Sequence, residues 1–163
     1  MSRAWLLALL MATSVATEGH AARPSEIRLT QTEIAAQHRA HGGAGTSGVA
    51  GIETVVLAGD PTVTGPYTIE LRVPANTKIA AHTHRDNRTA VVVSGIWHFG
   101  YGKIATASAT KALGPGSFYS EPGGDAHFAM TGRSPVTVII SGFGPTDTNF
   151  IGADHSAQPE KQP

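Results

Sequence analysis

Three histidines lie in two short stretches whose spacing permits metal binding. His82 and His84 are separated by one residue, and His127 follows a turn rich in glycine and proline at residues 122–124. Alternate residues of a β-strand point to the same face, so His82 and His84 would present two imidazoles side by side on a strand. A third imidazole from a neighbouring strand would complete one face of a metal coordination sphere and leave other positions open. Imidazole binds Fe, Mn, Co, Ni, Cu and Zn, so the residue type alone does not choose the metal.

The two stretches resemble the two motifs of the cupin family, small β-barrels that hold a metal ion near the middle of the barrel. The first family motif is, roughly, H-x-H, three or four residues, Glu, six residues and Gly; His82, His84 and Gly95 match it. The second is Gly, five residues and P-x-G-x-x-H, which residues 116–127 match without a gap. The resemblance covers about residues 50–150. It implies an all-β, cupin-like double-stranded β-helix, or jelly-roll barrel, whose His82, His84 and His127 bind one divalent transition metal such as Fe, Mn, Ni, Cu or Zn.

The sequence departs from the family pattern at the acidic ligand of the first motif. Arg88 stands at that position, Thr89 at its four-residue alternative, and Thr131 replaces the final Asn of the second motif. Three neutral imidazoles leave a divalent ion with its full charge, which favours an anionic bidentate ligand such as an enolate or catecholate. Some cupin dioxygenases use three His without Glu, so the departure is compatible with an oxygenase. Glu121 and Asp86 are further possible oxygen donors, but neither occupies a matching motif position.

Arg88 has two interpretations. A guanidinium about 5 Å from a divalent ion would repel it by roughly 6–7 kcal/mol at an effective dielectric near 20. Arg88 therefore either turns away from the metal or faces it with an anion between them. In the second case its planar fork would hold a carboxylate or enolate of the substrate. From the sequence we favour the first case, a solvated Arg88 at a strand start beside Asp86.

Two aromatic residues follow Gly95 on one face of an expected strand. Trp97 and Phe99 share that face, and His98 points to the other. By analogy with cupins, Trp97 and Phe99 would line the barrel and contact substrate; they would serve equally as ordinary core aromatics. On the same alternation, the small Ala80 should lie beside the H-x-H pair and leave space for a ligand.

The elements that must position these residues are short strands. Glycine is abundant and only 15% of the residues are charged, which favours a β-rich class over a helical one. Residues 67–73 alternate between apolar and polar, as a half-buried strand does. Many short strands separated by turn residues predict a sandwich or barrel. Strands are expected at residues 52–57, 67–73, 79–84, 89–94, 96–101, 111–113, 117–120, 127–130 and 136–142.

Residues 23–49 should form a short N-terminal helix and a Gly-rich connector before the barrel at residues 50–152. Thr30 and Glu33 have the spacing of a capping box, and Gly42 can end the helix. His38 and His41 would then lie on that helix. We interpret them as solvated residues, because no carboxylate or further His lies nearby in the sequence.

The ends of the chain are expected to lie outside the barrel. Residues 1–22 combine Arg3, an apolar run at residues 4–12 and small residues, the pattern of a secretory signal peptide. An uncleaved anchor is the alternative. Residues 153–163 are expected to form a polar tail. The chain has no cysteine, so a secreted or periplasmic protein would depend on its core rather than on disulfides.

Composition also limits the partners. The 12 Lys and Arg residues balance 12 Asp and Glu residues, and no basic run occurs, which argues against nucleic acid and anionic membranes. We expect a small-molecule ligand and no stable membrane anchor after signal cleavage. A homodimer is also considered.

Two functions stay open. One is an exported metalloenzyme, such as an Fe(II)-dependent dioxygenase acting on a small oxygenated organic molecule. The other is a barrel that binds a metal or small molecule without catalysis.

Overall fold

The computed structural model describes residues 26–43 and 45–152 of the chain. The expected signal peptide at residues 1–22 and the expected tail at residues 153–163 lie outside these residues. Within the part that is described, no helix is long and apolar enough to span a membrane.

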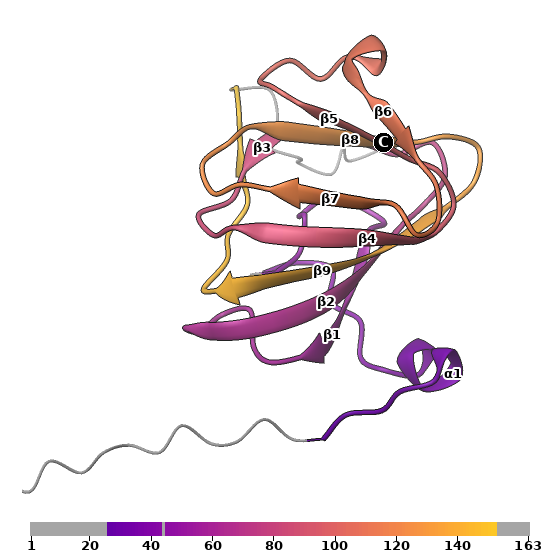
Figure 1. The fold of residues 1–163 in the computed structure, drawn as a ribbon, viewed down its shortest axis with the longest axis vertical. Helices are drawn as coiled ribbons and strands as arrows, with labels where there is room; N and C mark the ends of the chain where they lie inside the picture. Colours follow the sequence, from indigo (N-terminus) through magenta and orange to yellow (C-terminus); the bar gives the residue numbers. More distant parts are fainter. Residues whose placement is uncertain (1–25, 44, 153–163) are drawn as a thin grey trace, which may run out of the picture.

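The described residues form two five-stranded antiparallel sheets (Figure 1). One has the strand order β1-β2-β9-β4-β7 and the other β10-β3-β8-β5-β6. Apart from the β1–β2 and β5–β6 pairs, neighbours in each sheet are not consecutive in sequence, as in a jelly roll. The expected all-β class with a short N-terminal helix is confirmed. The strands are β1 (Glu53–Ala58), β2 (Gly65–Val73), β3 (Lys78–Thr83), β4 (Arg88–Ser94), β5 (Trp97–Tyr101), β6 (Lys111–Leu113), β7 (Phe118–Glu121), β8 (His127–Thr131), β9 (Val136–Gly144) and β10 (Asn149–Phe150).

The hydrophobic core draws side chains from both sheets. Ile69 of β2 and Val138 of β9 are fully buried in the first sheet, and Phe99 of β5 and Ala129 of β8 join the same cluster from the second. Alternation along the strands produces this core, because every second side chain points inward. The histidines of β3 and β8 lie at one part of this shared interior.

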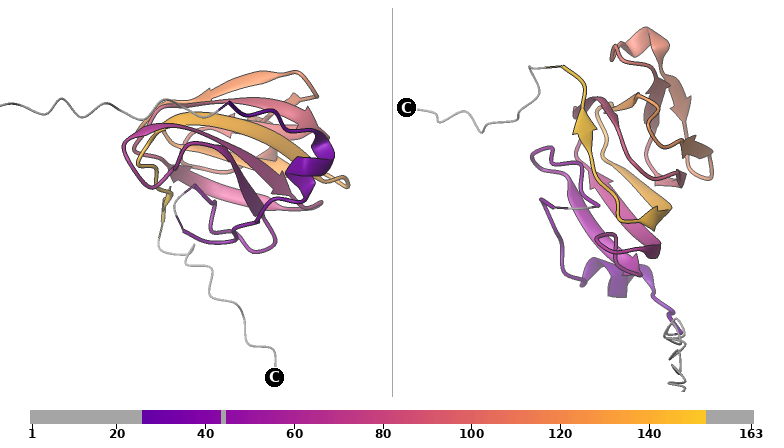
Figure 2. Two further views of the ribbon diagram at one scale, coloured as in Figure 1. Left: turned by 90° about the horizontal axis from the view of Figure 1, so that it is seen from below. Right: turned by 90° about the vertical axis from the view of Figure 1, so that its left-hand side faces the viewer.

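The N-terminal helix is shorter than the sequence indicates. Helix α1 (Gln31–Ala35) begins with the expected capping box between Thr30 and Glu33. None of its residues is buried, so no tertiary packing extends it. Ala40 instead forms a two-way backbone bridge with Thr54 of β1. Figures 1 and 2 show α1 beside the β1–β2 side of the molecule. His38 and His41 were expected on the helix, but both follow it; they are exposed, as expected.

Candidate metal centre

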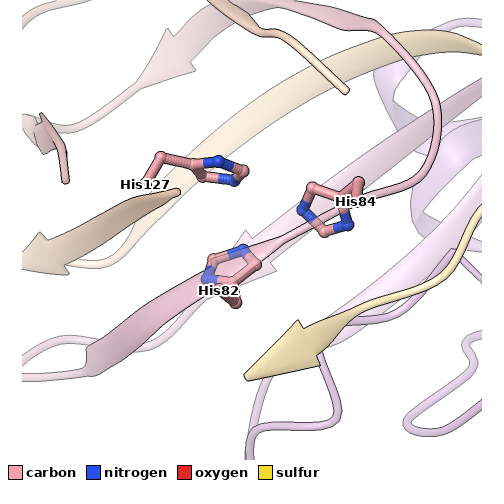
Figure 3. A group of neighbouring side chains, drawn as sticks. All are labelled: His82, His84 and His127. Carbon is pink, nitrogen blue, oxygen red and sulfur yellow. The ribbon is translucent and has the colours of Figure 1, made fainter. Parts of the chain in front are cut away.

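The structure brings the three motif histidines together between the sheets. His82 lies on β3, His84 directly follows that strand, and His127 begins β8. His82 and His127 are paired residues across the two strands. Their ring centroids are 4.4 Å apart, and that of His84 lies 4.8 Å from His82 and 5.0 Å from His127 (Figure 3). One ring nitrogen from each histidine lies within 4.8 Å of the other two, so the three buried rings could bind one metal ion.

A backbone carbonyl fixes the orientation of each ring. The Nδ1 of His82 donates to the carbonyl of Ala80 at 2.7 Å, and that of His127 donates to Asp125 at 3.1 Å. The Nδ1 of His84 donates to the carbonyl of Asp147. With Nδ1 protonated in all three rings, each Nε2 carries the lone pair that a metal needs. His127 Nε2 has no hydrogen-bond partner among the described residues. This donor set fits a divalent transition metal.

Burial keeps the three rings neutral at physiological pH. It lowers the pKa of His82 to about 4, with a smaller contribution from His127. Burial, followed by the charge of Arg88, lowers the pKa of His84 to about 3. Burial also lowers the pKa of His127. Only a neutral imidazole can ligate a metal, so the environment favours the ligating form.

Arg88 is buried beside these rings, with only 7% of its surface exposed. The interpretation of Arg88 as a solvated residue is therefore wrong. Its Nε donates to Glu121 Oε2 at 2.6 Å, and its Nη2 contacts the same oxygen and His84 Nε2. The burial of Arg88 was not expected, because the sequence did not reveal that Glu121, a buried carboxylate on the neighbouring strand β7, would compensate its charge.

Glu121, which the sequence did not place at a motif position, lies beside two of the three histidines. It is only 4% exposed, and its Oε2 lies 3.7 Å from the Nε2 of both His84 and His127. Burial, the largest single influence, would raise the pKa of Glu121, but the Arg88 guanidinium and the two neighbouring histidines together outweigh it, and the net pKa is lowered. Glu121 is directly opposite Arg88 because β4 pairs with β7, and this pairing could not be read from the sequence.

Asp86 has a different role from the oxygen donor that we considered. The Tyr67 hydroxyl donates to its Oδ2 at 2.7 Å, and the Thr146 hydroxyl donates to its Oδ1 at 2.6 Å. Both carboxylate oxygens are thus engaged. Burial of the Tyr67 ring is the main reason that its pKa is raised, to about 12. Asp86 thereby ties the β3–β4 loop to β2 and to the segment after β9.

Trp97 and Phe99 line a cavity that also contacts Arg88, Glu121 and the three histidines. The free volume of this cavity is about 30 Å³, enough for about two water molecules. Trp97 and Phe99 also belong to the hydrophobic core, so the structural role that we considered for them applies as well. His98 is not among the lining residues, in agreement with its expected outward orientation.

The expected place of Ala80 beside the histidines is wrong. The pairing of β3 with β8 shifts register between Ile79 and His82, so an additional residue interrupts the alternation. Ile79, rather than Ala80, lines the cavity opposite Ala129. A bulge of this kind leaves no clear sign in the sequence.

Two further contacts were not anticipated from the sequence. Phe150 lies on β10, a strand absent from the sequence prediction, and its ring centroid is 5.5 Å from that of His82. Thr131, at the position of the final family Asn, accepts from the Thr77 amide at 2.8 Å and donates to the Pro74 carbonyl at 2.7 Å. Thr131 thus fastens the end of β8 to the loop before β3, the strand that carries His82 and leads directly to His84.

Comparisons with known proteins agree on the fold. No protein-family model and no curated protein sequence matches the chain. Among solved structures, the polyketide cyclase RemF from Streptomyces resistomycificus is similar, with a TM-score of 0.60 and 18% identity over 80% of this chain and 89% of RemF. An RmlC-like cupin from Shewanella frigidimarina has a TM-score of 0.54 and 16% identity over 74% of this chain and 92% of its own.

A third similar chain comes from the structures of the DMSP lyases RdDddP and RnDddQII. It has a TM-score of 0.53 and 18% identity over 62% of this chain. The matched part spans only 53% of the length of that solved chain. At such identities the likeness concerns the fold. Together with the two motif stretches and the clustered histidines, it confirms the resemblance noted in the sequence: this chain has the cupin fold.

Proposed function

We propose that this protein is an exported metal-binding cupin whose His82, His84 and His127 hold one divalent transition ion, iron in the active form, for a dioxygenase reaction. The substrate would be a small oxygenated organic molecule such as an enediol, diketone or catechol. The observation that supports the proposal most is the convergence of three neutral Nε2 atoms, each fixed by a carbonyl at its Nδ1.

The bound ion would supply the redox and Lewis-acid chemistry, since iron with open positions can take both the substrate and O₂. Oxidative cleavage of such a substrate breaks its C–C bond and the O–O bond and forms two new bonds between carbon and oxygen; the substrate supplies all four electrons, so the reaction needs no separate reductant. The protein holds the ligands rigidly and excludes bulk water. The buried Trp97 and Phe99 supply this dry wall, because both line the cavity and pack in the core.

Access for a substrate is the next requirement, because a cavity of about 30 Å³ is too small for an organic molecule. Phe99 and Tyr119, whose ring centroids are 4.3 Å apart, form a wall of this cavity. The same two residues line an open groove of about 570 Å³ between β5, β6 and β7. We place the substrate route through this groove, with displacement of the Phe99–Tyr119 wall as the step that admits it.

The small cavity also supports the second function that we considered, metal binding without catalysis. A site that admits an ion and one or two waters but no organic molecule would store or carry the metal. Substrate turnover separates the two functions, because only the enzyme must open the Phe99–Tyr119 wall.

The test is oxygen consumption by anaerobically iron-loaded protein with a panel of enediols, diketones and catechols. We expect uptake of O₂ with at least one compound and two ¹⁸O atoms in the product when ¹⁸O₂ is used. His127→Ala should abolish the uptake. His98→Ala is the matched control and should retain it, because His98 lies on the opposite face of β5 from Trp97 and Phe99.

A protein that binds one iron ion through its histidines, yet consumes no oxygen with any member of the panel, contradicts the dioxygenase proposal and supports metal binding alone. Uptake that persists in His127→Ala shows that the reaction does not depend on this site.

A further inference from the structure

The position of the missing acidic ligand is directly opposite a second-motif glutamate. Arg88 of β4 and Glu121 of β7 are paired residues, so their side chains lie on the same face of the sheet. Both are buried, with 7% and 4% of their surface exposed. The two strands therefore place a carboxylate beside the histidines, although it is carried by β7 instead of β4.

The hydrogen bonds around this pair leave an excess of acceptors. Glu121 Oε2 and the Nε2 atoms of His84 and His127 all face one another, and none carries a proton when the rings are neutral. Arg88 is the cation that the structure provides, and it contacts Glu121 and His84. Among the described residues, His127 Nε2 has no hydrogen-bond donor. A buried acceptor without a donor is costly, so this cluster favours a second cation.

The spacing of these acceptors is suitable for a metal ion. Glu121 Oε2 is 3.7 Å from His84 Nε2 and 3.7 Å from His127 Nε2. Bonds of about 2.1 Å to nitrogen and oxygen place two ligand atoms about 3.4 Å apart in a tetrahedral site. Movements of a few tenths of an ångström would therefore bring the Glu121 oxygen and either of these histidines to one ion.

We propose that Glu121 is the carboxylate ligand of the metal, taking the place of the acidic residue that position 88 lacks, and that Arg88 competes with the metal for His84. This inference rests on the metal site proposed above. Metal binding must displace Arg88 Nη2 from His84 Nε2, while Arg88 stays paired with Glu121. The Glu121–Arg88 pair adds no net charge, so the centre keeps the full charge of the ion and attracts an anionic substrate. The displaced Nη2 can then donate to that anion.

The test is titration of the metal-free protein with Co²⁺, followed by calorimetry and by visible absorption, which reports the ligands of the ion. Glu121→Gln should weaken binding by at least about tenfold and change the absorption spectrum. Arg88→Met should strengthen binding by at least about tenfold, because it removes a competing cation. Arg88→Lys keeps the charge and should stay close to the unmodified protein.

Loss of Glu121 also leaves the Arg88 charge uncompensated, which would weaken binding without any ligation. The double variant Glu121→Gln/Arg88→Met separates the two effects. If Glu121 is a ligand, the double variant still binds Co²⁺ at least about tenfold more weakly than Arg88→Met. Glu70→Gln and Arg72→Met are matched controls, because this buried glutamate and its arginine partner on β2 do not line the cavity.

The outcomes separate this inference from the proposed function. A Glu121→Gln variant with unchanged affinity and spectrum overturns the role of Glu121 while leaving the histidine site in place. Weaker binding with an unchanged spectrum shows that Glu121 acts by charge alone and also overturns its role as a ligand. Failure of the unmodified protein to bind any divalent ion overturns both proposals. If Arg88→Met does not fold, as judged by far-UV circular dichroism, the Glu121→Gln spectrum decides.

Discussion

At the scale of single residues, the site is defined by which nitrogen of each histidine is free. The carbonyls of Ala80, Asp125 and Asp147 take the Nδ1 protons, so three Nε2 lone pairs converge in a buried space. Asp147 is itself held, because its carboxylate accepts from the Arg85 amide at 2.8 Å and from Arg85 Nε at 3.0 Å. These contacts orient the ligands before any ion arrives, which favours affinity and selectivity.

The depressed histidine pKa values give the metal-free protein a defined pH dependence. The pKa is lowered from 6.5 to about 4 at His82 and to about 3 at His84. Below pH 6.5 the unfolded chain therefore binds more protons than the folded one, and stability falls as the pH falls. We expect the free energy of unfolding to decrease by roughly 5 kcal/mol between pH 7 and pH 4.5 from these two histidines. Urea unfolding in the presence of a chelator measures it.

The control for this pH dependence is His82→Gln, which should flatten the slope because one buried titrating ring is removed. An equally steep slope in that variant, or a flat profile in the unmodified protein, would show that the histidines are not protected from protonation by burial.

The sequence was informative about residues whose type alone restricts their role. The H-x-H spacing and the Gly-Pro turn before His127 led to three rings that the structure brings together. Glu121 and Arg88 were misjudged, because their roles arise from strand pairing between β4 and β7. Pairing between distant segments is set by the whole fold, and a single sequence carries little trace of it.

At the scale of elements, strand turns hold the motif residues in register. Gly95, the last residue of the first motif, joins β4 to β5 with a φ of 77°, a conformation that side chains disfavour. A Cβ at this position would lie 2.3 Å from the carbonyl oxygen of Pro135. The turn therefore needs glycine for its backbone angle and for its close approach to the start of β9.

Replacement of Gly95 by alanine should consequently destabilise the protein by on the order of 2 kcal/mol or more. Gly132→Ala is the matched control, since no atom lies within 4 Å of a Cβ added there. Chemical denaturation of both variants measures the difference. Comparable stability of the two variants would indicate that the β4–β5 turn tolerates a side chain and that Gly95 has no special structural role.

Most strands were predictable because alternation is a local property of the sequence. The boundaries of β6 agree with expectation, and β2 is extended at its start to Gly65. The two-residue strand β10 was missed because its pairing with β3, and not its own sequence, makes it a strand. The bulge in β3 was missed for the same reason, since it exists only relative to β8.

At the scale of the whole molecule, export stays a prediction from residues 1–22. We expect the mature protein to begin between Thr17 and Arg23 and to occur outside the cytoplasm. N-terminal sequencing of the protein from its native host is the measurement. A soluble form that retains Met1 or Ser2 would contradict the signal peptide. The homodimer that we considered likewise stays a prediction.

The central claim, that the three histidines form a metal site, is tested most directly by counting bound ions. Protein stripped of metal, reloaded with Co²⁺ or Mn²⁺ and dialysed should retain about one ion per chain by elemental analysis. The double variant His82→Ala/His127→Ala should retain none while its far-UV circular dichroism stays β-rich. Retention of one ion per chain by the folded double variant would contradict the assignment of the metal site to these histidines.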